Sequence, residues 1–551
     1  MSRSRENSLG LPRRLLLGAG AALPFALTGA RAQNVPPPPS APRGQVVVGL
    51  SQEPTVFNPL MPSIEVDQGV WWNLFDPLWG VDSDGNLTPA LAKEVPSVEN
   101  GGISKDGLSW TVRLKEGVTW HDGTPFTAED VKFTIDLLNN PSFRARTRLG
   151  ANLVRDITIK GPHEISWRME KAYSPYLSLL AWTFIVPKHL LASASDPNTA
   201  PFNNAPVGTG PFRWGERVPG DHLTLLANTK YHGTGPYLER VVFKYIPDLT
   251  VLYTQFRTGQ IDHASIQGIL ANFYEEAKKL KGLVLSVNPS QQVEAIAPNL
   301  EFPALADKAV RQALYHGINK QAITDIVYYG LPKPTESFYP RQSWAYNADL
   351  PAHRYDPAAA NKILDEAGWK RGARGIREKN GVRLEFNSST TAGNPLREQV
   401  QQLLAQDWQN IGASMKIANM PAAVIWGEFF TMSKFQSVLV SATYQTGNDP
   451  DCAYRFSSKA TPAKGGAGSN TMQYSNPEVD RLLEEATATF DREERRTAYQ
   501  KVQALVRDDL AILPIYQPAP VEGLKEGLIG YKPNINVQSN CWNMATWYWA
   551  R

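Results

Sequence analysis

Few residues in this chain have the type and spacing that a catalytic or metal-binding site requires. Most of these residues could equally have a structural role. Asp449-Pro450-Asp451 places two carboxylates one residue apart, which could bind Ca²⁺ or supply a general acid and base. The same tripeptide is typical of a proline-stiffened loop with Asx turns. His121-Asp122 could be part of a catalytic dyad, but adjacent side chains on a strand point to opposite faces, so we favour a role in a turn.

The glycine and histidine motifs argue against the common cofactor and catalytic sites. Gly208-Thr209-Gly210-Pro211 begins like a dinucleotide loop, but Arg213 stands where the third glycine is needed, and Pro211 has no N–H for a phosphate. No two of the eight histidines stand three or four residues apart, and no His-Glu-x-x-His, Gly-x-Ser-x-Gly or Walker A sequence occurs. We therefore expect no cofactor, no metal centre and no enzymatic activity.

The two cysteines, Cys452 and Cys541, are too few for a cysteine-rich metal site in a chain of 551 residues. In an oxidising compartment they could form one disulfide. Their separation along the chain says nothing about their distance in space, so a paired and an unpaired state both stay open.

The first 32 residues have the three parts of a secretory signal. Arg13-Arg14 precedes an apolar run that reaches Leu27, and Ala30-Arg31-Ala32 follows it. The run is too short to cross the roughly 30 Å hydrocarbon core of a membrane. The arginine pair favours the twin-arginine route, with an ordinary Sec signal as the alternative. Since no cysteine lies near the exit, we expect a periplasmic protein without a lipid anchor.

The charge of the chain depends on this leader. Removing residues 1–32 takes away five arginines and one glutamate, so the formal net charge falls from +3 to −1. Neither value suits a protein that binds nucleic acid or an anionic membrane. The proline-rich stretch within residues 33–43 predicts a stiff tether, and the fold is expected to begin near Gln45.

The remaining chain predicts strands and helices without strict alternation. Apolar or alternating runs predict strands over 46–50, 109–114, 157–159, 165–169, 223–226, 241–246, 437–441 and 512–516. Capping residues predict helices that begin at Thr127, Asp356-Pro357, Asn476-Pro477 and Asp491. This mixture is typical of an α/β or mixed α+β protein with several mixed sheets.

Several of these segments resemble one family of proteins, and they follow one another in that family's order from about Val46 to Tyr516. The matching segments are Leu87 to Ala92, Lys105 to Leu114, Trp120 to Val131, Val207 to Phe212, Phe256 to Asp262, Val310 to Leu314 and Ile363 to Trp369. They resemble the family 5 extracellular solute-binding proteins, which are the dipeptide- and oligopeptide-binding components of ABC importers.

The resemblance implies a two-lobed periplasmic-binding-protein clamshell of the large peptide-binding type. Lobe I would comprise residues 44–75, 205–292 and 518–551, an inserted subdomain residues 76–204, and lobe II residues 293–517. Two crossing segments would join the lobes, which close over a solute by a hinge motion. The expected partners are a peptide or other small solute and the membrane permease, with no nucleic acid and a monomeric chain. An opine, an oligosaccharide or a metal chelate is the alternative ligand, and a periplasmic hydrolase or a receptor is the alternative function.

The resemblance also suggests which residues meet the ligand. Residues 421–451 would form one wall of the cleft, and the edge of lobe I another. The candidates are Asn58, Ser63, Trp71, Trp72, Trp426, Tyr444, Gln445, Thr446 and Asp449. In the family's peptide binders an aspartate pairs with the peptide α-ammonium, and Thr446 stands at that position here. Trp426 would lie on a helix, with burial in the core as the alternative, and one of Trp71 and Trp72 could be core and the other surface.

Overall fold

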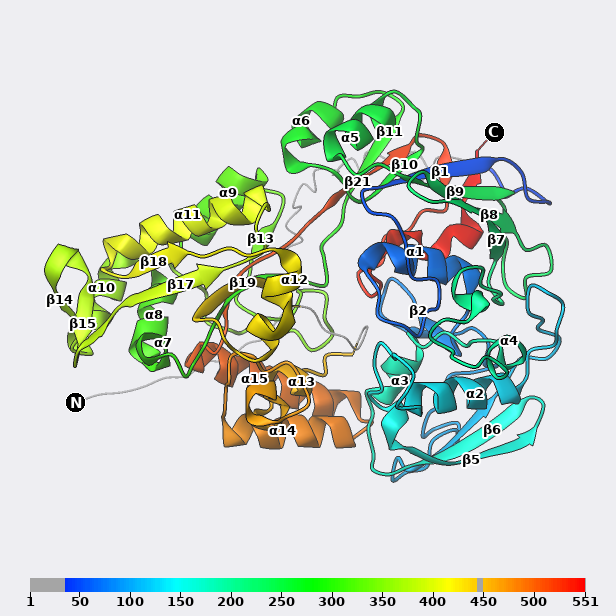
Figure 1. Cartoon of the computed structure of the whole chain (residues 1–551), viewed down its shortest axis with the longest axis horizontal. Coiled ribbons are helices and arrows are strands. Elements are labelled where there is room, and N and C mark those ends of the chain that lie inside the picture. The colour runs from blue at the N-terminus through cyan, green and yellow to red at the C-terminus, as the bar shows by residue number, and fades with distance from the viewer. Residues whose placement is uncertain (1–34, 443–448, 551) are drawn as a thin grey trace, which may run out of the picture. The chain divides into compact units, whose positions relative to one another are not determined.

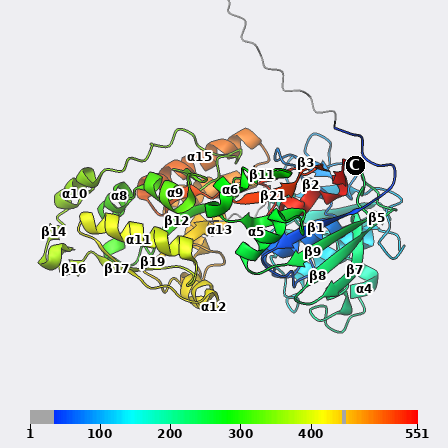
Figure 2. The same ribbon diagram turned by 90° about the horizontal axis from the view of Figure 1, so that it is seen from above.

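A seven-stranded mixed sheet contains the first strand of the fold, in a computed structural model that describes residues 35–442 and 449–550. Its strand order is β11-β21-β10-β1-β9-β8-β7, with β1 parallel to both β9 and β10 (Figures 1 and 2). The strands are β1 (Gln45–Leu50), β7 (Phe212–Val218), β8 (His222–Ala227), β9 (Arg240–Tyr245), β10 (His263–Ile269), β11 (Leu283–Val287) and β21 (Val521–Lys525). The chain therefore returns to this sheet near its C-terminus.

A second sheet has six strands in the order β13-β20-β12-β19-β17-β18. Strand β12 is antiparallel to β19 and β20, whereas β17 is parallel to β18 and β19. The strands are β12 (Val293–Pro298), β13 (Lys333–Pro334), β17 (Glu385–Ser389), β18 (Ser414–Ile417), β19 (Ser437–Ala442) and β20 (Leu513–Gln517). Both sheets are mixed, which confirms the α/β class expected from the sequence.

Two short segments carry the chain between these sheets. Residues 288–292 join β11 to β12, and residues 518–520 join β20 to β21. The segments run side by side, because the amide of Ser290 donates to the carbonyl of Pro518 at 2.8 Å and the amide of Asn288 to that of Pro520 at 3.0 Å. We call these two connections the crossing segments.

Between β1 and β7 the chain forms a third, three-stranded sheet in the order β4-β6-β5. Its strands are β4 (Ser109–Arg113), β5 (Val154–Gly161) and β6 (Glu164–Met169), preceded by the short pair β2 (Trp79–Val81) and β3 (Leu87–Pro89). One continuous hydrophobic core contains Val46 of the first sheet and Trp110 of the third. The third sheet thus shares a core with the first, whereas the second sheet contributes to two separate cores.

The helices surround these sheets, and most of the predicted caps are confirmed. Thr127 caps α2, Asp356 caps α10, Asn476 caps α14 and Asp491 caps α15. The helices are α1 (Glu65–Leu74), α2 (Ala128–Asn139), α3 (Tyr176–Leu180), α4 (Lys188–Leu191), α5 (Leu249–Arg257), α6 (Tyr274–Ala277), α7 (Pro303–Ala306), α8 (Lys308–His316), α9 (Lys320–Tyr328), α10 (Pro357–Glu366), α11 (Pro395–Asn410), α12 (Ala422–Val424), α13 (Ala453–Phe456), α14 (Pro477–Ala488) and α15 (Arg492–Asp509). Small strands complete the fold: β14 (Lys370–Arg371), β15 (Arg377–Lys379), β16 (Val382–Arg383), β22 (Leu528–Ile529) and β23 (Tyr548–Trp549).

The loop Gly208-Thr209-Gly210 packs closely against the backbone of Leu74 at the end of α1. Gly210 donates its amide to the carbonyl of Leu74 at 3.0 Å. His121 holds the loop from the other side, since its Nδ1 accepts the amide of Gly208 at 3.1 Å and its Nε2 lies 3.0 Å from the carbonyl of Gly210. The structure therefore confirms that His121 stabilises a turn, and the glycine loop packs against Leu74.

We expect Gly208→Ala to lower the free energy of unfolding by about 1–3 kcal/mol, the usual cost of overpacking. A Cβ on Gly208 would lie 1.7 Å from the carbonyl oxygen of Leu74, so the backbone would have to move. Gly161→Ala is the matched control, because no atom lies within 4 Å of the corresponding Cβ. Urea unfolding of both variants measures the difference, and equal midpoints would contradict the prediction.

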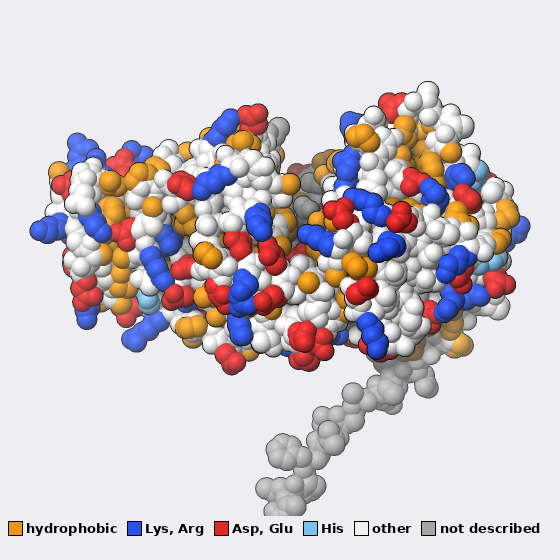
Figure 3. All heavy atoms as spheres, turned by 90° about the horizontal axis from the view of Figure 1, so that it is seen from below, with side chains coloured by type: hydrophobic (Ala, Val, Ile, Leu, Met, Phe, Trp, Pro, Cys, Tyr) orange, Lys and Arg blue, Asp and Glu red, His pale blue; other side chains and the backbone are white. Residues whose placement is uncertain are grey.

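The surface carries both signs of charge. Figure 3 shows basic and acidic side chains intermixed over the face that it presents, without a large area of one sign. Among the helices of residues 35–442 and 449–550, none is long and apolar enough to pass through a membrane.

Candidate functional site

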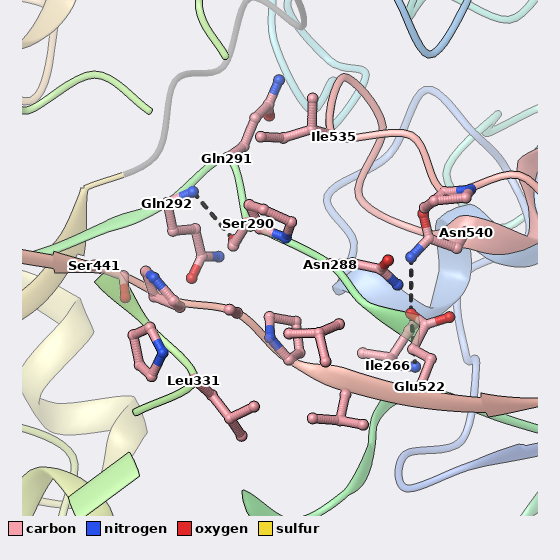
Figure 4. Close-up of a pocket in the computed structure, with 18 of the residues that line it drawn as sticks. Ile266, Asn288, Ser290, Gln291, Gln292, Leu331, Ser441, Glu522, Ile535 and Asn540 are labelled. Carbon is pink, nitrogen blue, oxygen red and sulfur yellow. Dashed lines mark hydrogen bonds between the residues drawn. The ribbon is translucent and has the colours of Figure 1, made fainter. Parts of the chain in front are cut away.

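A cavity of about 620 Å³ lies at the two crossing segments. Residues 288–292 and 518–520 all line it, and residues of both large sheets complete the wall. Figure 4 shows Ser290, Gln291 and Gln292 of the first crossing on one side, with Glu522 and Asn540 farther along the cavity. A ligand here would contact both sheets and the connections between them.

At the first-sheet end of the cavity, the carboxylate of Glu522 is buried and well supplied with donors. It accepts a hydrogen bond from the side-chain amide of Asn540 at 2.9 Å, from the hydroxyl of Tyr531 at 3.0 Å and from Nε2 of His263 at 3.0 Å. Burial alone would raise the pKa of Glu522, but the hydrogen bond and charge of His263, followed by the other donors, lower it overall. Glu522 is therefore ionised.

His263 on β10 supplies the compensating charge behind Glu522. The imidazole is fully buried, which works against protonation. The contacts with Cys541 and Glu522 outweigh burial and raise the pKa of His263 to about 9. The imidazolium and the carboxylate form a neutral pair inside the protein, and only the carboxylate side of that pair lines the cavity.

Glu65, the first residue of α1, lines the same end of the cavity. Its side chain is half-buried, and no hydrogen bond or ion pair joins its carboxyl group to another residue of the described chain. Burial, followed by repulsion from Glu522, raises the pKa of Glu65 to about 7. Near neutral pH this carboxyl group can gain or lose a proton.

The second-sheet end of the cavity carries a closed ion pair. Arg397 of α11 donates two hydrogen bonds to Glu294 of β12, at 2.7 and 3.0 Å, and a third to the hydroxyl of Ser441 at 3.1 Å. Ser441 in turn donates to Glu294. Beside them the hydroxyl of Tyr516 donates to that of Tyr328 at 2.6 Å. The charges at this end neutralise each other.

The walls between the two ends combine apolar side chains with the polar side chains of Asn288, Ser290, Gln291 and Gln292. Five prolines and several aliphatic side chains line the cavity, and the aromatic residues of the described lining are the tyrosines Tyr328 and Tyr516. Stiff apolar walls with a few polar groups are typical of a pocket that encloses a small organic ligand. Within the ranges 35–442 and 449–550, no three His, Cys, Asp or Glu side chains are placed to hold a metal ion.

Comparison with known proteins identifies the family. Residues 86–464, more than half of the chain, match the family described as "Bacterial extracellular solute-binding proteins, family 5 Middle". The chain belongs to this family. Its members are solute-binding proteins, so the fold is that of a family 5 solute-binding protein.

Three relatives cover nearly the whole chain. The oligopeptide-binding protein AppA of Bacillus subtilis is 27% identical over 92% of each chain, and its structure in complex with a nonapeptide superimposes with a TM-score of 0.77 at 26% identity, over 94% of this chain and 100% of that one. Protein XP55 of Streptomyces lividans is 32% identical over 92% of this chain and 90% of its own. The structure of NikZ from Campylobacter jejuni with Ni(L-His) gives a TM-score of 0.79 at 27% identity, over 92% and 99% of the two chains.

The predicted ligand residues of lobe I lie away from the lining of this cavity. Asn58 is fully buried, and its amide donates to the side chain of Asn203 at 2.9 Å. Ser63 is half-buried. Trp71 and Trp72 are both buried in the core, so the expectation that one of the two is a surface residue is wrong. Their ligand role stays a prediction without support from this cavity.

Of the ligand residues predicted within residues 421–451, the structure describes Trp426 and Asp449. Tyr444, Gln445 and Thr446 lie outside the described residues. Trp426 lies in a π-helical turn over Ile425–Phe429 after α12, and its Nε1 donates to the hydroxyl of Thr391 at 2.9 Å. It is partly buried and packs edge-on against Phe430.

Asp449 and Asp451 have structural partners. Both oxygens of Asp449 accept hydrogen bonds from Arg495, at 2.8 and 2.7 Å. Asp451 is buried and accepts a hydrogen bond from the hydroxyl of Tyr173 at 2.9 Å. Tyr173 precedes α3, so this bond also ties residues near the third sheet to the loop after β19. The two carboxylates are not exposed together, as an acid and base pair would require.

The two cysteines do not form a disulfide. Cys452 and Cys541 are both free and buried, and they belong to different hydrophobic cores.

The charged residues of the cavity were missed in the sequence. Glu294 and Glu522 each stand inside a short strand whose residues are otherwise mostly apolar, and a charge buried in such a strand requires a partner. That signal could have marked both. Glu65 opens a helix like many other acidic residues, and nothing in the sequence around it distinguishes it.

Proposed function

We propose that this protein is the solute-binding component of an ABC importer, which captures a peptide or peptide-like solute and delivers it to a membrane permease. The observation that carries the proposal is the cavity at the crossing segments, with a wall drawn from both large sheets. Its volume of about 620 Å³ lies within the range of small-molecule pockets. A hinge motion about the crossing segments would change the cavity directly, because all of their residues line it.

The proposal includes a division into lobe I (44–75, 205–292 and 518–551), an inserted subdomain (76–204) and lobe II (293–517). Sheet membership supports it, since every strand of the seven-stranded sheet falls within the first set of ranges and every strand of the six-stranded sheet within the last. The third sheet falls entirely within the insert. Residues 1–32 would act as the export signal of a monomeric periplasmic protein without a lipid anchor.

A peptide or peptide-like ligand is favoured by the pattern of the cavity, which has charged groups at two ends and both apolar and amide side chains between them. A metal chelate is the second candidate ligand, because the related NikZ binds Ni(L-His). An opine or an oligosaccharide would also use the polar groups. The hydrolase alternative loses its basis, because Arg495 and Tyr173 engage the two aspartates on which it depended. The proposed protein is not an enzyme.

The proposal predicts stoichiometric binding without turnover. Native mass spectrometry of the protein freshly purified from its own periplasm should show a retained small solute, and the same solute should be released unchanged on denaturation. A solute present at 100 times its Kd should stabilise the folded protein by about 2.7 kcal/mol and raise its melting temperature. Release of a chemically altered solute, or no effect of peptides, opines, oligosaccharides and nickel–histidine on melting, would contradict it.

A further inference from the structure

The charges of the cavity do not balance. Its lining contains three glutamates, Glu65, Glu294 and Glu522, and one cationic residue, Arg397. Arg397 and Glu294 neutralise each other through two hydrogen bonds. At the first-sheet end His263, behind the lining, compensates Glu522, and Glu65 is left without a basic side chain among the described lining residues.

Glu65 and Glu522 differ in how their hydrogen bonds are satisfied. Glu522 accepts hydrogen bonds from Asn540, Tyr531 and His263, and these hold its carboxylate in position without a ligand. Glu65 has no donor among the described residues, although it is half-buried and faces the same space. A half-buried carboxyl group without a hydrogen-bond partner does not stabilise the fold. Its presence in a cavity therefore indicates that a bound ligand supplies the missing donor.

We infer that Glu65 is the residue with which this cavity selects solutes that carry a cationic group, an ammonium or a guanidinium. The inference rests on the proposed function, because it assigns a specificity to the same cavity. Glu65 makes the direct contact, since Glu522 already accepts four hydrogen bonds, from Asn540, Tyr531, His263 and the backbone amide of Ile266. The apolar walls then contact the rest of the solute.

Binding of such a solute is linked to the proton on Glu65. The charged and titratable groups around this carboxyl are Glu522 from β21, His263 and Tyr531 behind Glu522, and Asp67 on its own helix. With a pKa of about 7, Glu65 is largely protonated at pH 6 and largely ionised at pH 8. A cation binds the ionised form, so the affinity of agmatine, which stays protonated, should rise about tenfold between these two pH values. The affinity of a peptide should rise about fivefold, because about half of its α-ammonium groups lose their proton near pH 8.

The test uses isothermal titration calorimetry of the whole protein with Ala-Ala, Ala-Ala-Ala, penta-alanine, their N-acetylated forms and agmatine. We expect the best free-amine probe to bind about 10- to 100-fold more tightly than its N-acetylated form at pH 8. Glu65→Gln should reduce that ratio to near one and abolish the rise in affinity with pH. Glu65→Asp, which keeps the charge, should retain most of the preference, and Glu129→Gln, at an exposed first turn of α2, should retain all of it.

The outcomes separate this inference from the proposed function. If the free and the acetylated probes bind equally well, or if Glu65→Gln keeps the preference, the inference is wrong while the solute-binding function stands. If no probe binds and the protein purified from its periplasm retains no solute, the proposed function fails and the inference falls with it.

Discussion

Arg495→Ala is expected to lower the free energy of unfolding by about 3–5 kcal/mol, because it leaves a buried carboxylate without its ionic partner. The side chains of Arg495 and Asp449 are 8% and 4% exposed, and the guanidinium binds both carboxylate oxygens. Arg495 also donates to the carbonyl of Ala486 at 2.9 Å, so the substitution removes a contact with α14 as well. Water cannot replace these bonds at a site so deeply buried.

Arg481→Ala is the matched control for this prediction. Arg481 also forms two ion pairs, with Glu478 and Glu485, but its side chain is 51% exposed. Exposed pairs contribute about 0–1 kcal/mol, so this variant should unfold near the wild-type midpoint. Urea unfolding monitored by circular dichroism compares the two, and a loss below about 1 kcal/mol for Arg495→Ala would show that the buried pair contributes little.

Glu65→Gln is expected to stabilise the protein above neutral pH. The unfolded chain loses the proton of Glu65 near pH 4.5, whereas the folded protein keeps it until about pH 7. In this window the folded state binds more protons, so its stability falls as the pH rises from 4.5 through 7. The shift corresponds to about 3 kcal/mol, of which the N-terminus of α1 recovers part by favouring the anion. We therefore expect a net gain of about 2–3 kcal/mol for the variant at pH 8.

Melting of both proteins from pH 4 to pH 8 measures this effect. The curves should coincide near pH 4, because a neutral glutamine resembles a protonated glutamate, and should diverge as the pH rises. Glu129→Gln serves as the control, since Glu129 is 51% exposed and pairs with Lys188 at the surface. Parallel curves for wild type and Glu65→Gln would mean that Glu65 ionises normally in the folded protein.

Local structure could be predicted well at positions where the backbone conformation strongly favours one residue type, such as the first residues of a helix. Asp356 and Asn476, each followed by proline, mark helix starts because a capping side chain and a fixed φ act within one turn. The turn at Gly161-Pro162 likewise separates two paired strands. Trp426 was harder, because the chain after Pro421 forms only three α-helical residues before a π turn in which Gly427 is not helical.

The candidate site could not be predicted in the same way. Glu65, Glu294 and Glu522 are separated by hundreds of residues, and they line one cavity only because the chain crosses twice between the two large sheets. The tryptophans could not be placed from the sequence either. Trp71 and Trp72 are of a residue type that often lines ligand sites, but both are buried in the core. A side chain's type sets what it can bind, but burial and neighbours decide whether it is available.

The sequence by itself determined the family, the α/β class and the starts of several helices, because these depend on residue order and on interactions within a few residues. The tertiary structure decided which charges are neutralised. Asp449 is buried against Arg495, Glu294 against Arg397 and Glu522 against His263, while Glu65 is left facing a cavity without a partner. The electrostatic energy of a carboxylate depends on distances and burial that only the folded chain sets, and for that reason the sequence alone could not identify Glu65.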